Sequence, residues 1–430
     1  MNRLIIVFFL GYLSVLSGCD TAENVQPRNE DFFIKVYSGV NRGNQVGNDI
    51  IETSGGGLLI AGTSYSEGTA IDQSDSVEYL LIKTDLKGDI EWKVGGHSAG
   101  LLKSEAKSLI ELPNSTYLLG GTVYDNTVSR SVLLNFDLNG NLIDSAYVFT
   151  DTVRNSLSKI TYGHSGILVS GETDHVTPGG GGINGFLKLY DLSLNEVGTG
   201  TERIRYFGTP GEDRVTGAYE VKDTVNNIGS EGVRFLAFGN TNFVKDGLDN
   251  NFYYVGFNKD YLQSVGIGPS TMYEEVGSNE YSISLNGFED SFWQIGYTDD
   301  NADPNIFMVG WEFNEDSESD WGTKLFNPSI TAGDPVIGKD VSIQNGTHTV
   351  IVCDVQYTID NSEIYLVKLD RNKDIQEPWP KTYGTNTSSY SASAVTTLQD
   401  GSIVVLGTAD LEPIKKLIVI KTGPDGQMNF

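Results

Sequence analysis

The side chains that most often carry catalysis or bind metals are scarce and scattered in this sequence of 430 residues. It has four histidines, and none has a second histidine or a cysteine at the spacing of zinc ligands. No Gly-x-Ser-x-Gly motif occurs, and no cysteine is paired with a histidine as a reactive thiol would be. We therefore expect no catalytic motif, no metal and no cofactor. The histidines are His97, His164, His175 and His348.

Carboxylates are abundant, and some stand in pairs such as Asp299-Asp300 and Glu315-Asp316. Two carboxyl groups held about 5 to 9 Å apart can hydrolyse a glycosidic bond, but sequence spacing does not define that separation. The segment that starts at Asp137 shares Asp-x-Asn-Gly with a calcium-binding loop. Its twelfth position is Val148 where such a loop needs a bidentate glutamate, so we expect a β-turn there.

One class of residue recurs at a constant place in the chain. The chain contains copies of a repeat in which a threonine recurs. In five copies an aromatic ring stands two positions after this threonine or at the aligned position, and two copies carry Asp300 or Asp410 there. Aromatic rings at equivalent positions could stack on sugar rings or hold a peptide at one end of a channel. Packing between repeats is the alternative role. The predicted ligand-binding residues are Tyr65, Tyr124, His175, Phe243 and Tyr357.

The repeat itself is clearest between residues 56 and 93. An apolar run ends at Gly62-Thr63, a second ends at Lys83-Thr84-Asp85, and Trp92 follows the turn residue Gly88. The anchor position of the first run recurs at intervals of 50 to 68 residues, long enough for about four short strands per copy. The seven anchors are Gly62, Gly121, Gly171, Gly239, Gly296, Cys353 and Gly407.

Helical periodicity is absent over any useful length, and turn formers separate the apolar runs. This pattern predicts an all-β fold, a seven-bladed β-propeller of four-stranded blades. Residues 32–39 have the pattern of the fourth strand of a repeat, but no first three strands precede them. The last copy has the opposite pattern, because the chain ends where its fourth strand begins. We expect N- and C-terminal strands to share one blade and close the ring, which removes exposed sheet edges.

The charge excludes one class of partner. The chain has 29 basic and 57 acidic residues, a formal net charge of −28, and no cluster of lysines and arginines. Binding to nucleic acid needs basic patches that displace counterions from phosphates, so no nucleic-acid partner is expected. Acidic polymers are also disfavoured as ligands unless a metal bridges them.

The N-terminus reads as an export signal, with Arg3 followed by an apolar run from Leu4 to Leu16. Its end, Leu16-Ser17-Gly18-Cys19, resembles the lipobox of bacterial lipoproteins. The resemblance implies cleavage before Cys19 and lipidation, including palmitate, of that residue. The expected domains are a signal peptide at 1–18, a lipidated tether at 19–30 and the propeller at 31–430. Cys353 would then have no disulfide partner and is expected to be buried.

The repeats resemble those of propeller-forming lipoproteins of Bacteroidota-type bacteria, in which Gly-Gly-x-x-x-x-Gly-x-Thr precedes Leu-x-Lys-x-Asp. They also resemble bulb-type lectin domains loosely, without the mannose signature of those domains. The resemblance implies a non-catalytic lipoprotein, anchored in the outer membrane by its lipid, that binds a glycan or an envelope protein. Two alternatives stay open: a polysaccharide-degrading lyase or hydrolase of the same fold, and a structural subunit of an envelope complex.

The anchor can be tested directly. Replacing Cys19 by Ala removes the thiol that lipidation requires, so the variant should not incorporate radiolabelled palmitate and should leave the detergent phase. The measurement compares labelling and phase partitioning of the two proteins. Palmitate on the Cys19→Ala protein would refute the lipobox interpretation.

Overall fold

The computed structural model contains β-strands and turns, and no helix occurs among the residues that it describes. None of these residues therefore forms a helix that could cross a membrane. The described residues are 31–39, 43–66, 77–96, 103–124, 128–149, 153–175, 181–198, 204–221, 233–243, 250–258, 263–265, 272–273, 279–288, 291–299, 305–314, 317–326, 334–344, 348–358, 361–370, 374–375, 379–385, 388–411 and 413–428.

The strands form consecutive antiparallel units, which we number in chain order. Unit 1 is β2 (Gln45–Glu52), β3 (Leu58–Tyr65), β4 (Val77–Thr84) and β5 (Ile90–Gly96), and unit 2 is β6 (Lys103–Leu112), β7 (Thr116–Tyr124), β8 (Ser129–Phe136) and β9 (Leu142–Tyr147). Unit 3 is β10 (Asn155–Gly163), β11 (Gly166–Thr173), β12 (Asn184–Tyr190) and β13 (Ile204–Phe207). Unit 4 is β14 (Asp213–Glu220), β15 (Val233–Thr241) and β16 (Asn251–Asn258), with β17 (Gln263–Val265) and β18 (Met272–Tyr273) both paired to β16.

The remaining strands continue the pattern. Unit 5 is β19 (Glu280–Phe288), β20 (Ser291–Thr298), β21 (Asn305–Asn314) and β22 (Ser317–Phe326), and unit 6 is β23 (Val336–Gln344), β24 (His348–Thr358), β25 (Asn361–Leu369) and β26 (Lys381–Tyr383). Unit 7 is β27 (Tyr390–Thr397), β28 (Ile403–Asp410), β29 (Lys415–Thr422) and the N-terminal strand β1 (Phe33–Tyr37). β1 lies antiparallel to β29, with Lys35 opposite Val419.

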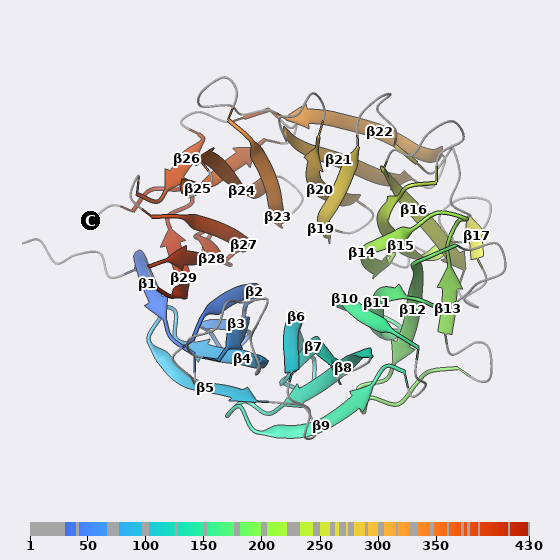
Figure 1. Ribbon diagram of the computed structural model, residues 1–430, viewed down its shortest axis with the longest axis horizontal. Helices are drawn as coiled ribbons and strands as arrows, with labels where there is room; N and C mark the ends of the chain where they lie inside the picture. Colours follow the sequence, from blue (N-terminus) through green and yellow to red (C-terminus); the bar gives the residue numbers. More distant parts are fainter. Residues whose placement is uncertain are drawn as a thin grey trace, which may run out of the picture.

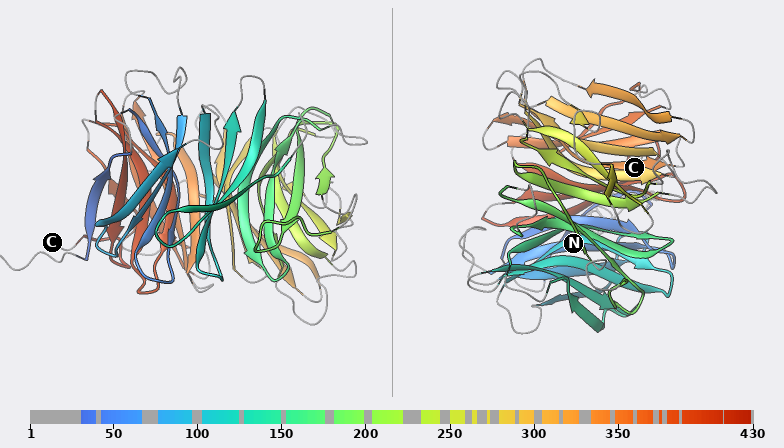
Figure 2. Two further views of the ribbon diagram at one scale, coloured as in Figure 1. Left: turned by 90° about the horizontal axis from the view of Figure 1, so that it is seen from below. Right: turned by 90° about the vertical axis from the view of Figure 1, so that its right-hand side faces the viewer.

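The units are arranged radially about a common centre, which makes the fold a β-propeller (Figure 1). The first strand of each unit lies nearest the centre, and the fourth lies at the rim. Figure 2 shows the strands running between the two ends of this disc. We call the first strand of each unit its inner strand. At one end of the disc the inner strands begin and the second strands end, and we call this end the entry face.

Apolar packing between neighbouring units forms the core. Buried side chains gather into seven clusters, and each cluster draws its residues mainly from two adjacent units. One of them joins Ile60 and Leu80 of unit 1 to Leu406 and Val419 of unit 7. Because each sheet buries both faces against its neighbours, its central strands are apolar along their whole length, which produces the runs seen in the sequence.

Every inner strand carries a β-bulge at the same register, directly after the residue that pairs with the repeat anchor. In unit 1, Gly47 pairs with Gly62, Asn48 is the extra residue, and pairing resumes at Asp49. The bulge turns the extra residue and its successor toward the channel and the next unit. The seven extra residues are Asn48, Lys107, Ser158, Thr216, Ile283, Lys339 and Ser393.

The bulge explains why the anchor is glycine. A methyl group on Gly239 would overlap the carbonyl oxygen of Arg214, and one on Gly296 would overlap the carbonyl oxygen of Tyr281. The same clash with the inner strand would occur at Gly121 and Gly171. Cys353 is the exception, and it is buried, as predicted.

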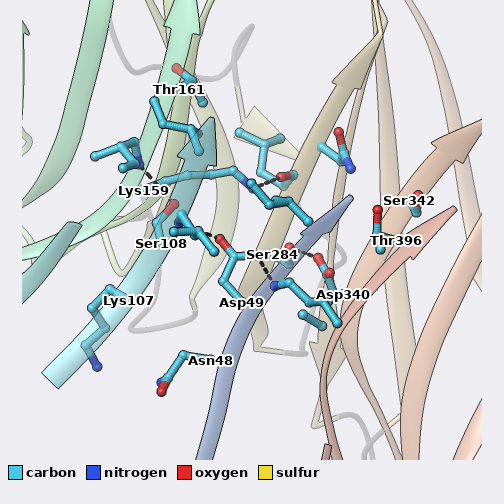
Figure 3. Close-up of a pocket in the computed structure, with 18 of the residues that line it drawn as sticks. Asn48, Asp49, Lys107, Ser108, Lys159, Thr161, Ser284, Asp340, Ser342 and Thr396 are labelled. Atoms are coloured by element: carbon cyan, nitrogen blue, oxygen red, sulfur yellow. Dashed lines mark hydrogen bonds between the residues drawn. The ribbon is translucent and has the colours of Figure 1, made fainter. Parts of the chain in front are cut away.

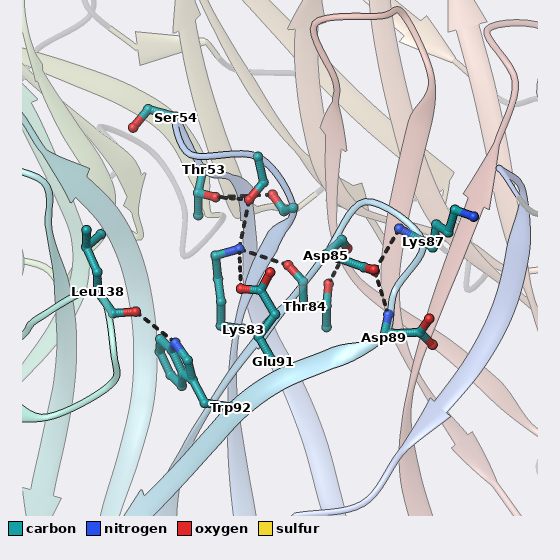
Figure 4. Close-up of polar contacts among 12 residues, drawn as sticks. Thr53, Ser54, Lys83, Thr84, Asp85, Lys87, Asp89, Glu91, Trp92 and Leu138 are labelled. Atoms are coloured by element: carbon teal, nitrogen blue, oxygen red, sulfur yellow. Dashed lines mark hydrogen bonds and ion pairs between the residues drawn. The ribbon is translucent and has the colours of Figure 1, made fainter.

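In unit 1 the Lys-x-Asp motif stabilises the turns at the end opposite the entry face (Figure 4). Lys83 Nζ donates to the carbonyl oxygens of Gly56 at 2.8 Å and Thr84 at 2.9 Å, and it pairs with Glu91 at 3.2 Å. Asp85 Oδ1 accepts the backbone N–H groups of Lys87 and Asp89. The motif therefore ties two turns of one unit together, an Asx-turn pattern.

An aromatic side chain from a rim strand packs on the glycine of the neighbouring unit's turn. Trp92 Nε1 donates to the Leu138 carbonyl at 2.9 Å, and its ring covers Gly140. Tyr37 Oη likewise donates to the Gly88 carbonyl at 2.7 Å. Gly88 and Gly140 have φ of +77° and +80°, so they need glycine for both conformation and close approach. In the Gly-x-Ile-x-Trp pattern, the glycine and the tryptophan are therefore the residues that make contacts between units.

The anchor glycine can be tested by one added methyl group. Gly239→Ala should lower the free energy of unfolding by about 3 kcal/mol, the upper end for overpacking, because the new Cβ meets backbone that cannot rotate away. Urea unfolding of both proteins measures this. Gly55→Ala is the matched control, because nothing lies within 4 Å of the added atom. Equal unfolding midpoints for the two variants would contradict the proposed role of the anchor.

Candidate functional site

Two hollows among the described residues share a border. The first is the central channel, a cavity of about 570 Å³ lined by residues of all seven inner strands (Figure 3). The second, of about 620 Å³, opens at the entry face beside units 2 to 5. Four lining residues belong to both, and all four are extra residues of bulges: Lys107, Ser158, Thr216 and Ile283.

Three charged side chains follow bulges inside the channel. Asp49 Oδ2 accepts the backbone N–H of Leu109 in unit 2 at 2.8 Å, and Asp340 Oδ2 accepts that of Val395 in unit 7 at 2.8 Å. Lys159 instead passes unit 4 and donates to the carbonyl of Leu285 in unit 5 at 2.6 Å. These contacts link the inner strands of different units: β2 to β6, β23 to β27 and β10 to β19.

The surroundings of Asp49, Asp340 and Lys159 shift the pKa values of all three side chains. Desolvation raises the pKa of Asp49 to about 6 and also raises the pKa of Asp340, although Lys159 lowers both. Burial by itself lowers the pKa of Lys159, but Tyr219, Asp340 and Asp49 outweigh it, so the net shift is upward. The surroundings therefore favour the charged form of Lys159, and they raise the pKa of Asp49 to about 6.

The entry-face pocket is polar and holds a stacked pair of tyrosines. Tyr281 at the start of β19 and Tyr297 at the end of β20 lie with ring centroids 4.9 Å apart at 21°. Burial raises the pKa of both hydroxyls, so each ring is a neutral hydrogen-bond donor at physiological pH. Asn240 and Asn250 from unit 4 lie along the same pocket.

A charged group occupies the pocket beside unit 3. Arg214 Nη1 lies 3.1 Å from Glu172 Oε2, and Arg214 Nη2 lies 3.6 Å from Glu212 Oε2. Burial raises the pKa of Glu172, while Arg214 and the backbone N–H of Val215 lower it. Among the described residues that line the pocket, the other cation is Lys107, whose Nζ lies 3.3 Å from Glu105.

Of the five aromatic residues predicted to bind a ligand, Tyr124 lines this pocket. Its hydroxyl donates to Glu105 Oε2 at 3.1 Å. Tyr65 lies at the end of β3 and is buried, with 9% of its surface exposed. Burial raises the pKa of the Tyr65 hydroxyl to about 12, and Tyr65 in turn contributes to the raised pKa of Tyr124. The two rings are thus close neighbours in units 1 and 2.

The other three predicted residues lie farther around the entry face. His175 stacks on Tyr206 with centroids 4.2 Å apart. Phe243 is 42% exposed and borders Gly211, the neighbour of Glu212. Tyr357 packs on the cluster between units 5 and 6, and its hydroxyl donates to Glu363 at 3.3 Å. Cys19, the predicted lipidation site, lies outside the described residues.

Apart from Tyr124, sequence reasoning missed the residues of this pocket, although the repeat contains a signal for three of them. The residue directly after the anchor is threonine in units 1, 2 and 7, and it is Glu172, Asn240 and Tyr297 in units 3 to 5. These three substitutions all line the pocket. In unit 6 the position is Asp354, which accepts the backbone N–H of Ala392 and so links units 6 and 7.

Comparison with known proteins supports the fold. No protein-family model and no curated protein matches the chain. Two structures of ulvan lyase, described as a new family of polysaccharide lyase, match with TM-scores of 0.54 and 0.55 at 10% identity. Each alignment covers 92% of this chain and 97% of the lyase, and one lyase was solved bound to -[GlcA(1-4)Rha3S]-. An alpha-L-arabinanase of Penicillium chrysogenum matches with a TM-score of 0.44 at 8% identity, over 74% of this chain and 92% of the enzyme.

The channel carboxylate generates a prediction about pH. The folded-state pKa of Asp49 exceeds its unfolded value, so the folded state binds more protons between about pH 4 and 6. Its contribution to stability therefore falls as pH rises through that window. The unfolding free energy of Asp49→Asn minus that of wild type should therefore increase by about 1–3 kcal/mol from pH 4 to pH 8. This range allows for screening by channel water.

Urea unfolding at pH 4, 6 and 8 measures this difference. Asp137→Asn is the control, because hydrogen bonds within an exposed turn lower the pKa of Asp137 and its effect has the opposite sign. A pH-independent difference between wild type and Asp49→Asn would show that Asp49 does not titrate in the channel.

Proposed function

We propose that this protein is a carbohydrate-processing β-propeller that binds a glycan in the entry-face pocket. The observation that carries the proposal is the stacked pair Tyr281 and Tyr297 in a polar pocket of about 620 Å³. Sugar rings present apolar C–H faces that stack on aromatic rings and hydroxyl groups that bind amides and carboxylates. The pocket supplies both kinds of partner, with Asn240 and Asn250 beside the rings.

The likeness to ulvan lyase supports a role in carbohydrate processing at the level of the fold. The predicted lyase or hydrolase thereby gains support over the predicted binder. Binding without catalysis is the second candidate function, and exposed Phe243 next to the pocket rim favours it, because it adds aromatic surface without reactive groups.

We further propose that each strand unit is one blade, so that the propeller has seven blades and β1 closes the ring by pairing with β29. The apolar cluster between units 7 and 1 supports this closure. The lipobox-like segment ending at Cys19 supports a lipid anchor at the cell envelope, with the outer membrane as its site. The pocket would then face polysaccharide outside the membrane, and no nucleic-acid partner is proposed for so acidic a chain.

The pocket can be tested by removing one ring at a time. Tyr281→Ala and Tyr297→Ala should each weaken glycan binding by about 1–3 kcal/mol, the range measured for aromatic stacking on nucleobases. That range corresponds to a roughly 5- to 150-fold rise in Kd. An array of neutral and acidic glycans identifies the ligand, and calorimetry then gives the affinities.

Tyr162→Ala is the matched control, because Tyr162 is 43% exposed and lies at the other end of its inner strand, outside this pocket. Melting temperatures of all three variants separate loss of binding from loss of folding. A wild-type protein that binds no glycan on the array, or tyrosine variants that bind as tightly as wild type, would refute the proposed function.

A further inference from the structure

Two glutamates in the entry-face pocket are held by one guanidinium. Glu172 follows the anchor of unit 3, and Glu212 directly precedes the inner strand of unit 4. Their oxygens lie 3.1 Å and 3.6 Å from the two terminal nitrogens of Arg214. Those nitrogens are about 2.3 Å apart in the rigid guanidinium fork, so the two carboxylate oxygens are at most about 9 Å apart. Inverting glycoside hydrolases hold their two carboxyl groups about 6.5 to 9.5 Å apart, so the upper limit here allows such a pair with a water molecule between them.

The two carboxyl groups have unlike surroundings. The side chain of Glu172 is 20% exposed, whereas that of Glu212 is 54% exposed. Burial raises the pKa of Glu172 and favours its protonated form, and the backbone N–H of Val215 orients it. Two carboxyl groups whose environments differ in this way are the arrangement that assigns one as acid and the other as base.

We propose that Glu172 is the general acid and Glu212 the general base in the hydrolysis of a neutral glycan, which rests on the function proposed above. Glu172 donates its proton to the glycosidic oxygen as the bond from that oxygen to the anomeric carbon breaks. Glu212 takes a proton from a water molecule whose oxygen bonds to the same carbon. One water is consumed, and Glu212 returns its proton through solvent as Glu172 regains one.

The charges of the pocket select a neutral substrate. With Glu172 protonated, Arg214 is still balanced by the carboxylate of Glu212, and Lys107 is balanced by Glu105, so the described lining offers no uncompensated cation for a uronate or sulfate. Eliminative cleavage of a uronate builds negative charge at the substrate carboxylate, and cations that are already paired with glutamates offer little to stabilise it. Arg214 acts here as a positioning residue for the two glutamates.

The first test identifies the reaction. The mature chain is incubated in H₂¹⁸O with neutral polysaccharides (arabinan, xylan, galactan and mannan) and, separately, with alginate and polygalacturonate. Hydrolysis should place one ¹⁸O atom on the new reducing end of a neutral product. Unsaturated uronate products, which form without uptake of water, would overturn the proposal.

The second test assigns the residues with isosteric variants. Glu172→Gln and Glu212→Gln should each lower kcat/KM by about 10²- to 10⁴-fold, the contribution of a general acid or base. Asp354→Asn is the control for Glu172, because it occupies the same place after the anchor in unit 6. Glu111→Gln is the control for Glu212, because Glu111 is a surface carboxylate that contacts Ser54 outside this pocket. Both controls should keep wild-type kcat/KM.

A third readout excludes a merely structural role. The substrates for this readout are aryl glycosides of the sugar that the enzyme hydrolyses, because their phenolate leaving group departs without needing a proton. Glu172→Gln should lose much less activity on these aryl glycosides than on the polysaccharide. The wild-type rate should also fall as pH rises through the elevated pKa of Glu172, and Glu172→Gln should lack that limb.

The outcomes separate the two proposals. Wild-type activity in either glutamine variant, or equal losses on both kinds of substrate for Glu172→Gln, would overturn the catalytic assignment. Tyrosine-dependent binding of a glycan without turnover would overturn the assignment and leave the binding function standing. Absence of any glycan binding would remove both proposals.

Discussion

The inner-strand bulge opposite a glycine is the constraint on which the rest of this propeller depends. Seven times, an inner strand gains one residue directly after its partner to the anchor, and in most units only hydrogen fits on the anchor carbon. The extra residue bends each strand where it passes the centre of the ring. The side chains that follow then reach the next inner strand, as Asp49 reaches Leu109 and Asp340 reaches Val395.

The repeated geometry also explains how function can enter a repetitive scaffold without disturbing it. The position after the anchor links to the next unit in several copies: Thr122 accepts the N–H of Leu157, Thr408 that of Gly47, and Asp354 that of Ala392. In units 3 to 5 the same backbone position presents Glu172, Asn240 and Tyr297 to a pocket. Glu172 still makes the link to the next unit, because it accepts the backbone N–H of Val215, and it lines the pocket as well. The bulge and the sheet hold the local backbone, so this position accommodates different side chains.

The channel shows the cost and the use of buried charge in the same scaffold. Lys159 needs space to cross unit 4, and Gly217 provides it: a Cβ there would lie 2.9 Å from the lysine Cδ. The lysine then meets the Leu285 carbonyl and lies under the influence of Asp49 and Asp340. A charged residue is tolerated there because opposite charges and backbone dipoles replace its hydration.

The sequence by itself determined the all-β class, the repeat, the turn chemistry and the buried Cys353, because these depend on local pattern: apolar runs, glycines with positive φ and Asp-x-x-Gly turns. It also predicted that β1 belongs with the last repeat, and β1 does pair with β29. Only the tertiary structure brought Tyr281 beside Tyr297 and placed Arg214 between Glu172 and Glu212. Tyr281 and Tyr297 are opposite partners on β19 and β20 of one unit, Glu212 and Arg214 are two residues apart, and Glu172 comes from the neighbouring unit. Which of these side chains meet depends on strand register and on packing between units, and sequence spacing does not define either. For the same reason the predicted aromatic set was only a set of equivalent positions, of which Tyr124 lines the pocket and Tyr65 packs in the interior.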